Sequence, residues 1–159
     1  MRGVAGSGEP LSGPAAGRPI WFGPKPTELR LADGGLVRSL GIELTEAGDD
    51  WLVGRMPVDE RTRQPFGLLH GGASVALAET LASLAAYACV DPQRYVCVGL
   101  EINANHLRPV RTGWVEGTAR PIHLGRTTQV WDIRICEEAG KPICISRCTM
   151  AVVDKPPDA

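Results

Sequence analysis

One apolar segment limits the possible folds of this chain more than any other part of its sequence. Residues 73–89 consist almost entirely of alanine, leucine, valine and small hydroxyl residues. The larger apolar members recur at helical spacing, at Leu77, Leu81, Leu84 and Ala88. A helix that is apolar around most of its circumference lies inside a protein or a membrane, and a membrane span needs about 20 such residues. This segment is shorter than that and ends at Asp91-Pro92, so we predict a core helix.

Glu79 is the only charged residue between His70 and Asp91. An unpaired carboxylate in an apolar setting is unfavourable or changes its pKa, so its presence needs a reason. Ser83 lies one turn further along the same helix face. A lone glutamate on a helix more often points into solvent, but the alanine-rich surroundings favour a cavity shared by Glu79, Ser83 and the start of the helix. We therefore interpret both residues as candidates for a functional site.

The loop before this helix ends in Gly71-Gly72. Glycine allows a ligand to approach the backbone closely, and the first N–H groups of a helix have no intrahelical partners. Together with the positive end of the helix dipole, these donors can stabilise a developing oxyanion. Gln64 adds an amide donor, and His70 adds a group that bonds or titrates near neutrality. Each residue alone fits a turn, a cap or a surface loop; their combination indicates a site.

These residues resemble a known family. The stretch Gln64-Pro-Phe-Gly-Leu-Leu-His-Gly-Gly-Ala-Ser-Val-Ala-Leu-Ala-Glu79, followed by Ser83, is similar to hotdog-fold acyl-CoA thioesterases of the PaaI-like and Arthrobacter-type 4-hydroxybenzoyl-CoA branch. Within that branch it most resembles the 1,4-dihydroxy-2-naphthoyl-CoA and enterobactin-proofreading subfamilies. The likeness extends from about Ile20 to Val153 and includes three further stretches, Met56-Pro57-Val58-Asp59, residues 98–106 and His123-Leu124-Gly125.

The resemblance implies a reaction and a role for each site residue. The reaction is hydrolysis of an acyl-CoA, with an aroyl group such as 1,4-dihydroxy-2-naphthoyl or hydroxybenzoyl, to the free acid and CoA. Gly71 and Gln64 would hold the thioester oxygen, and Glu79 from the other subunit would act as nucleophile or as general base. His70 would orient the site, and Ser83 would position water or the leaving group.

CoA binding requires donors for phosphate groups. The best candidates are His106, Arg108, Gly125 and Arg126, and the sequence leaves open whether these are ligand groups or ordinary surface residues. The histidines are dispersed and lack metal-ligand spacing. We therefore expect no metal and no cofactor other than the CoA of the substrate.

Strands are predicted where apolar and polar residues alternate, over residues 42–47, 51–58, 96–105, 114–119, 127–136 and 143–153. Gly48-Asp49-Asp50 favours a hairpin turn, residues 27–41 one helix or two short pieces, and residues 120–126 a link. The apolar face of the longest strand is expected to consist of Val96, Val98, Leu100, Ile102 and Ala104. One helix among antiparallel strands predicts an α+β layer, which is the hotdog fold implied by the resemblance: an antiparallel sheet wrapped around one long central helix.

The chain of 159 residues, 43% of them hydrophobic, fits one soluble domain. We expect a disordered tail over residues 1–19, a thioesterase domain over 20–154 and a short tail over 155–159. A formal net charge of −1 gives no indication of a nucleic-acid or membrane partner. The N-terminal tail lacks a secretory signal pattern and the five cysteines lack a disulfide pattern, so we expect a cytoplasmic protein with reduced thiols.

A strand with an open edge favours pairing between subunits. Family members form homodimers or dimer-of-dimers tetramers with active sites at the subunit interface, and the resemblance implies the same here. Acyl carrier proteins are possible partners besides acyl-CoA. Two other functions stay open on the sequence alone: a hotdog dehydratase or hydratase that pairs His70 with Glu79, and a non-catalytic acyl-CoA-binding module.

Overall fold

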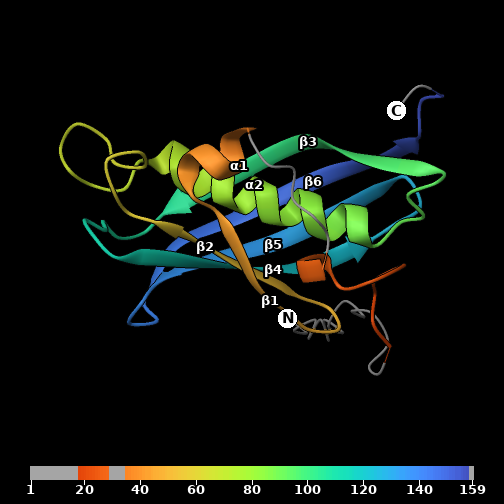
Figure 1. Cartoon of the computed structure of the whole chain (residues 1–159), viewed down its shortest axis with the longest axis horizontal. Coiled ribbons are helices and arrows are strands. Elements are labelled where there is room, and N and C mark those ends of the chain that lie inside the picture. Colours follow the sequence, from red (N-terminus) through yellow and green to blue (C-terminus); the bar gives the residue numbers. More distant parts are fainter. Residues whose placement is uncertain (1–17, 29–34, 158–159) are drawn as a thin grey trace, which may run out of the picture.

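The computed structural model describes residues 18–28 and 35–157, and at its centre is the long helix α2 (Gly71–Ala88). This helix lies across one face of a six-stranded antiparallel sheet (Figure 1). The strand order in the sheet is β1-β2-β4-β5-β6-β3. The strands are β1 (Glu43–Ala47), β2 (Leu52–Pro57), β3 (Tyr95–His106), β4 (Trp114–Leu124), β5 (Thr128–Glu137) and β6 (Pro142–Asp154). The predicted α+β arrangement of a sheet around one long helix is therefore confirmed.

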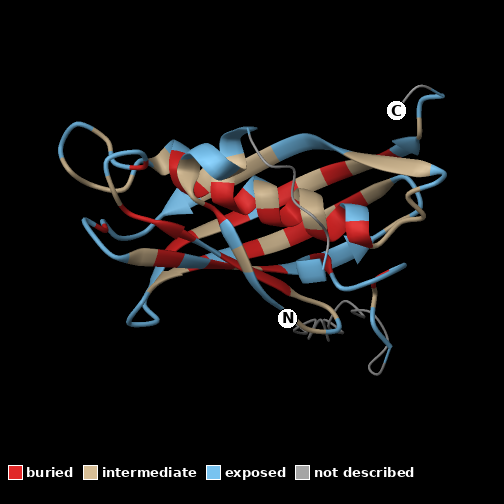
Figure 2. Cartoon of the chain, viewed as in Figure 1, coloured by how far each residue is buried: buried red, intermediate tan, exposed pale blue. Residues whose placement is uncertain are grey.

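The face of α2 that meets the sheet is buried and consists of leucine, alanine and one serine (red in Figure 2). Leu77 and Leu81 have no exposed surface, and neither have Met56 and Trp131 of the sheet. Complete burial of such a side chain contributes about 1.5–3 kcal/mol. Glu79 lies outside this buried face, beside the edge strand β3, and is exposed in the single chain.

The N-terminal elements are short. They are a 3₁₀ turn, η1 (Pro26–Glu28), and a helix, α1 (Gly35–Leu40). The predicted alternatives of one helix or two pieces depend on residues 29–34, which lie outside the described part. The predicted hairpin is confirmed by antiparallel pairing of β1 with β2 around residues 48–50. Residues 1–17, 29–34 and 158–159 lie outside the described part, so the predicted N-terminal tail falls almost wholly outside it.

Strand β4 is longer than predicted, and the link expected over residues 120–126 is wrong for residues 120–124. The strand continues to Leu124, with a register shift between Pro121 and His123 in its pairing with β5. The pairing of β4 with β2 ends at Ala119. Pro121 therefore has only one neighbouring strand, and at such a position the missing N–H of proline is tolerated.

Strand β3 contains a bulge. Its pairing with β6 shifts register between Gly99 and Glu101, which leaves Leu100 as the extra residue. An inserted residue reverses the side of the strand on which the following side chains lie, because side chains alternate with a period of two. The two halves of β3 therefore present different sets of residues to α2.

The single apolar face predicted for this strand is consequently wrong for its first half. Cys97 packs against the core before the bulge, and Ile102 and Ala104 pack against it after the bulge. Val98 and Leu100 instead are 47% and 62% exposed. Because β3 is an edge of the sheet that the described residues form, these apolar side chains lie along a strand with one side unpaired in that sheet.

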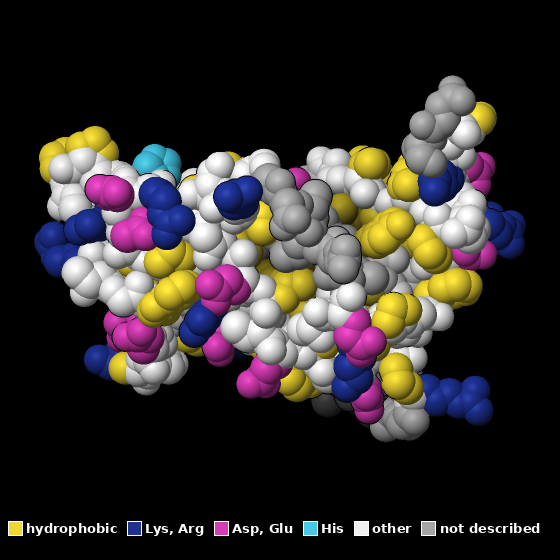
Figure 3. Space-filling view, viewed as in Figure 1, with side chains coloured by type: hydrophobic (Ala, Val, Ile, Leu, Met, Phe, Trp, Pro, Cys, Tyr) yellow, Lys and Arg dark blue, Asp and Glu magenta, His cyan; other side chains and the backbone are white. Residues whose placement is uncertain are grey.

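The surface that carries α1 and α2 shows basic and acidic side chains interspersed with one another (Figure 3). This distribution agrees with the small formal net charge and gives no broad field of one sign. Within the ranges 18–28 and 35–157, no helix combines the length and the apolar character that crossing a membrane requires.

Candidate active site

The start of α2 leaves one backbone donor free. The side chain of His70 caps the helix, with Nδ1 accepting a hydrogen bond from the N–H of Gly72 at 2.8 Å. The carbonyl oxygen of His70 accepts from the N–H groups of Ala73 at 2.9 Å and of Ser74 at 3.2 Å. The N–H of Gly71 has no partner among the described residues. It is therefore available, at the positive end of the helix dipole, to a negatively charged atom.

Gln64 is held by the loop that leads into α2. Its backbone N–H donates to the carbonyl of Leu68 at 2.8 Å, and its own carbonyl accepts from Gly67 at 2.9 Å. The side-chain oxygen Oε1 accepts from the N–H of Phe66, which fixes the orientation of the carboxamide. Within the described chain Nε2 has no hydrogen-bond partner, so this group is a positioned donor for a ligand.

A pocket of about 340 Å³ lies beside these two donors. Four predicted site residues come together in its lining, Gln64, Gly71, His106 and Arg108. His106 lies directly against the helix start, because a Cβ on Gly71 would stand 2.8 Å from His106 Nε2. Arg108 donates to the carbonyl of Pro142 at 2.7 Å and is otherwise exposed. The pocket therefore joins oxyanion-type donors to groups that can meet phosphate.

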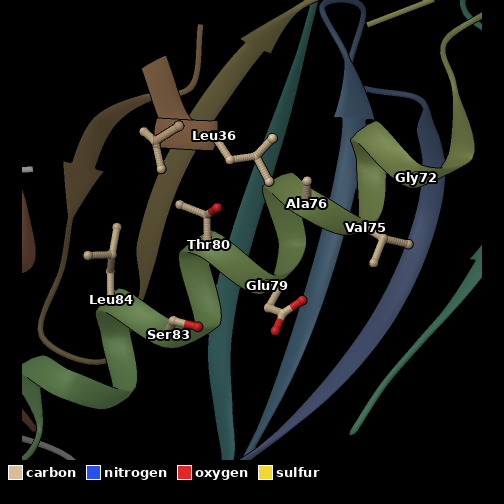
Figure 4. A pocket seen from close by; sticks show the side chains of 9 residues that line it. Leu36, Gly72, Val75, Ala76, Glu79, Thr80, Ser83 and Leu84 are labelled. Carbon is tan, nitrogen blue, oxygen red and sulfur yellow. The ribbon is translucent and has the colours of Figure 1, made fainter. Parts of the chain in front are cut away.

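A second pocket, of about 590 Å³, contains Glu79 and Ser83 on successive turns of α2 (Figure 4). The Ser83 hydroxyl makes a weak contact with the sulfur of Met150 at 4.0 Å. Leu36 reaches toward this pocket from α1. The predicted sharing of one cavity by Glu79 and Ser83 is confirmed. The other lining side chains are apolar or small, Val37, Val75, Ala76, Thr80 and Leu84.

The prediction that Glu79 also shares a cavity with the start of the helix is confirmed for Gly72 but not for Gly71 or Gln64 in the single chain. Gly72 does line the Glu79 pocket, but Gly71 and Gln64 line the other one. Gly71 and Glu79 are separated by about 12 Å along the axis of an α-helix. One chain therefore holds two half-sites, one with the amide donors and one with the carboxylate.

Gly125 and Arg126 line neither of these pockets. They lie in the connection between β4 and β5, where the N–H of Gly125 donates to the carbonyl of Thr128 at 2.9 Å. The single chain thus does not bring them together with His106 and Arg108. Their assignment to CoA stays a prediction.

Sequence reasoning missed the wall of the Glu79 pocket formed by Leu36 and Val37. These residues are apolar members of a short helix and carry no chemical signal of their own. Thr80 was also missed. Its position next to Glu79, as a polar residue in an otherwise apolar helix, could have identified it.

Three of the described cysteines are poor nucleophiles, and one of them, Cys148, lies near the Glu79 carboxylate. Burial raises the pKa of the Cys148 thiol to about 11, and the nearby negative charges of Glu79 and Glu101 contribute to this rise. Burial likewise raises the pKa of Cys97 to about 11 and of Cys89 to about 12. These thiols are protonated at neutral pH, so a carboxylate, not a thiolate, is the reactive group that this pocket offers.

The cap made by His70 predicts a stability effect. Replacing His70 by alanine removes the acceptor for the Gly72 N–H, and loss of an N-cap costs about 0.5–2 kcal/mol. We expect a correspondingly lower free energy of unfolding in urea. His70→Asn is the matched control, because asparagine is a good N-cap residue and is expected to retain most of this stability. Equal stability of the alanine variant and the unmodified protein would contradict the capping role.

Comparison with known proteins gives consistent matches. A family profile described as the Thioesterase superfamily matches residues 66–144, a range that includes Gly71, Glu79 and Ser83. The 1,4-dihydroxy-2-naphthoyl-CoA hydrolase of Escherichia coli is 52% identical over 123 residues, which are 77% of this chain and 90% of that protein. The proofreading thioesterase EntH of Cronobacter turicensis is 55% identical over 120 residues, or 76% of this chain and 87% of that protein.

Solved structures give the same result for the fold. The crystal structure of a mutant thioesterase from Pseudomonas aeruginosa matches with a TM-score of 0.75 and 60% sequence identity. The match covers 76% of this chain and 86% of that chain. At this identity the likeness within the matched region extends beyond the shape of the sheet and helix to most of the side chains.

Proposed function

This chain belongs to the thioesterase superfamily and hydrolyses acyl-CoA thioesters, and we propose that its substrates carry an aromatic acyl group. The observation that carries this proposal is the pocket of about 590 Å³ beside Glu79, lined otherwise by apolar or small side chains. Its volume lies within the range of about 300–1,000 Å³ typical of small-molecule sites. The similarity to a hydrolase named for 1,4-dihydroxy-2-naphthoyl-CoA supports an aromatic substrate, and hydroxybenzoyl-CoA has the same character.

The complete active site forms between two copies of the chain in this proposal. Each chain has one half-site with Gln64 and Gly71 and another with Glu79. The edge strand β3 offers 12 residues with one unpaired side, and exposed Val98 and Leu100 add apolar surface to be covered. Pairing along such an edge would satisfy its backbone groups. A homodimer is the smallest assembly that meets this requirement, and two such dimers would form a tetramer.

Hydrolysis then follows from the positions of the groups. The Gly71 N–H and Gln64 Nε2 hold the thioester oxygen and stabilise the negative charge that develops on it. Glu79 of the partner subunit either attacks the carbonyl carbon or removes a proton from an attacking water. A new C–O bond forms, the C–S bond breaks, and the CoA thiolate leaves and is protonated. No metal or further cofactor takes part.

His70 can assist without leaving its capping position. Because Nδ1 accepts from Gly72, the neutral imidazole carries its proton on Nε2. This N–H has no partner in the part of the chain that the structure describes, so it can donate to a group at the carbonyl or to the departing thiolate. Ser83 lies one helical turn beyond Glu79 and positions the attacking water or the leaving group.

The CoA part of the substrate meets His106 and Arg108 at the other pocket, with Gly125 and Arg126 as further phosphate donors in the assembly. An acyl carrier protein presents the same phosphopantetheine arm, so a carrier-bound acyl group is a second substrate form. Acyl-CoA metabolism and reduced thiols are features of the cytoplasm, where we place this activity.

A thiol-release panel tests the proposed substrate class. We expect kcat/KM for benzoyl-CoA and 1,4-dihydroxy-2-naphthoyl-CoA to exceed that for acetyl-CoA and palmitoyl-CoA by about 10-fold or more. An acetyl group buries less apolar surface in the pocket than an aromatic ring does, and a palmitoyl chain loses more conformational freedom when it is ordered there. Crotonyl-CoA tests the alternative of a hydratase, because its absorbance changes when its double bond is hydrated. Preference for palmitoyl-CoA would contradict the aromatic proposal.

The pocket wall formed by α1 predicts a change in selectivity. Leu36→Trp places a larger side chain in the pocket, and we expect kcat/KM for benzoyl-CoA to fall by about 10-fold while that for acetyl-CoA changes less. Leu36 is 61% exposed, so folding should tolerate the change. Leu36→Ala is the control, since it enlarges the pocket. A parallel loss for both substrates would show that Leu36 does not contact the acyl group.

A further inference from the structure

The Glu79 side chain lies close to the backbone of β3 at Gly99. A Cβ built on Gly99 would stand 2.8 Å from Glu79 Oε1, closer than real Cβ atoms approach a neighbouring atom. Gly99 does not have a positive φ angle, so its backbone conformation does not require glycine. The need for glycine at this position is therefore a need for space beside the carboxylate.

The bulge in β3 decides which residue faces Glu79. After the bulge, Ile102 and Ala104 pack toward the core, and in a regular strand Leu100 and Val98 would continue that face. The register shift between Gly99 and Glu101 moves these bulky side chains to the exposed side and turns Gly99 toward α2. Bulges often re-aim side chains next to active sites. Here the bulge removes side chains from the volume that the carboxylate occupies.

We propose that Gly99, placed by the bulge at Leu100, is a positioning residue that determines where the Glu79 carboxylate stands. This inference rests on the proposed role of Glu79 in the reaction. The atom nearest to the missing Cβ is the far end of a flexible side chain. A methyl group at position 99 therefore displaces the carboxylate more easily than it displaces β3, and the fold survives while the reactive group moves.

Gly99→Ala tests this role by kinetics with benzoyl-CoA. A misplacement of about 1 Å is enough for a rate loss of about 100-fold, so we expect kcat to fall by roughly 10-fold to 100-fold with KM within about 2-fold. Gly23→Ala is the control, because a Cβ added at Gly23 meets nothing within 4 Å and Gly23 lines neither half-site; its kcat should match that of the unmodified protein. Unchanged kcat in Gly99→Ala overturns the proposal, whereas unchanged kcat in Glu79→Ala overturns the proposed function itself.

Combination with Glu79→Asp separates displacement from general damage. Aspartate is one methylene shorter, so its carboxylate is withdrawn from position 99. We expect Gly99→Ala to lower the single-turnover rate by a smaller factor in the Glu79→Asp variant than in the unmodified protein. Equal factors in both backgrounds overturn the steric explanation.

Stability gives a second measure that does not depend on activity. If the new methyl group lowers the urea midpoint by pressing on the carboxylate, adding Glu79→Ala restores the midpoint. A decrease that persists in the double variant shows damage to β3 itself and overturns the proposal. This comparison also applies if Gly99→Ala folds poorly.

Discussion

Glu79→Ala and Glu79→Gln are expected to lower kcat by about 100-fold to 10,000-fold while the protein stays folded. The carboxylate is the group in the 590 Å³ pocket that can act as nucleophile or base, and the Cys148 thiol near it is protonated at neutral pH. Because the side chain is exposed in the chain, its removal leaves no buried gap. Thiol release from benzoyl-CoA and the urea midpoint, measured on the same preparations, check both parts of the expectation.

The control for this experiment is Glu46→Gln. Glu46 is an exposed glutamate on β1 and lines neither half-site, so its replacement changes net charge in the same way without touching the site. We expect it to retain full turnover. A Glu79→Gln variant that kept most of its turnover would contradict the assigned role, whatever the substrate.

The chemical form of that role needs a separate measurement. A single turnover in ¹⁸O-labelled water, with enzyme in excess, identifies a nucleophilic Glu79 if label enters the enzyme carboxylate. A nucleophilic Glu79 forms an anhydride with the acyl group of the substrate. Attack of water on the acyl carbon of this anhydride places the label in the product, and attack on the Glu79 carboxyl carbon places it in the enzyme. A general base leaves the carboxylate unlabelled and delivers all the label to the product. Label in the product alone is the result both of a general base and of an anhydride that water attacks at the acyl carbon.

The central helix could be predicted because its signals are local. Helical spacing and apolar composition fix a long buried helix, and Glu79 and Ser83 fall on one face of it by helical geometry alone. The structure confirms both points. The glycine pair likewise marked the start of α2, where the Gly71 N–H is free within the described chain.

The strand errors arise from single inserted residues. Leu100 in β3 and the shift between Pro121 and His123 in β4 depend on pairing with neighbouring strands. The alternation of apolar and polar residues is the same with or without a bulge, because it carries no information about the neighbouring strand and its register. Gly99 inside a strand was a weak signal of this kind, since glycine in a strand interior often marks a bulge or a close approach.

The division of the site could not be predicted from the residues themselves. Gln64, Gly71 and Glu79 are close in sequence, which suggests one cavity, but the rise of the helix separates them. Only the resemblance to a known family indicated that Glu79 comes from another subunit. The pocket wall at Leu36 comes from a distant segment, and its position depends on how α1 packs over α2.

Subunits that carry Gln64→Ala and subunits that carry Glu79→Ala are expected to regain activity when they assemble together. Each variant alone damages both active sites of a symmetric dimer, and loss of an oxyanion donor lowers kcat by about 100-fold to 1,000-fold. In a mixed dimer, one of the two sites contains both substitutions. The other site is intact, because it combines Gln64 from the Glu79→Ala chain with Glu79 from the Gln64→Ala chain. Mixed dimers isolated with two different affinity tags should therefore show about half of normal turnover.

The reciprocal mixture tests the geometry from the opposite direction. In a dimer of one unmodified chain and one Gln64→Ala/Glu79→Ala chain, each shared site contains one damaged residue, so we expect turnover near that of the single variants. If both residues instead served a site within one chain, this mixture would have about half of normal turnover, because one of its two sites would be intact. The Gln64→Ala with Glu79→Ala mixture would then stay inactive. A shared site predicts high turnover for the first mixture and low turnover for the second, whereas a site within one chain predicts the opposite. A low yield of assembled protein would lower both values, so it cannot produce the expected pair of results.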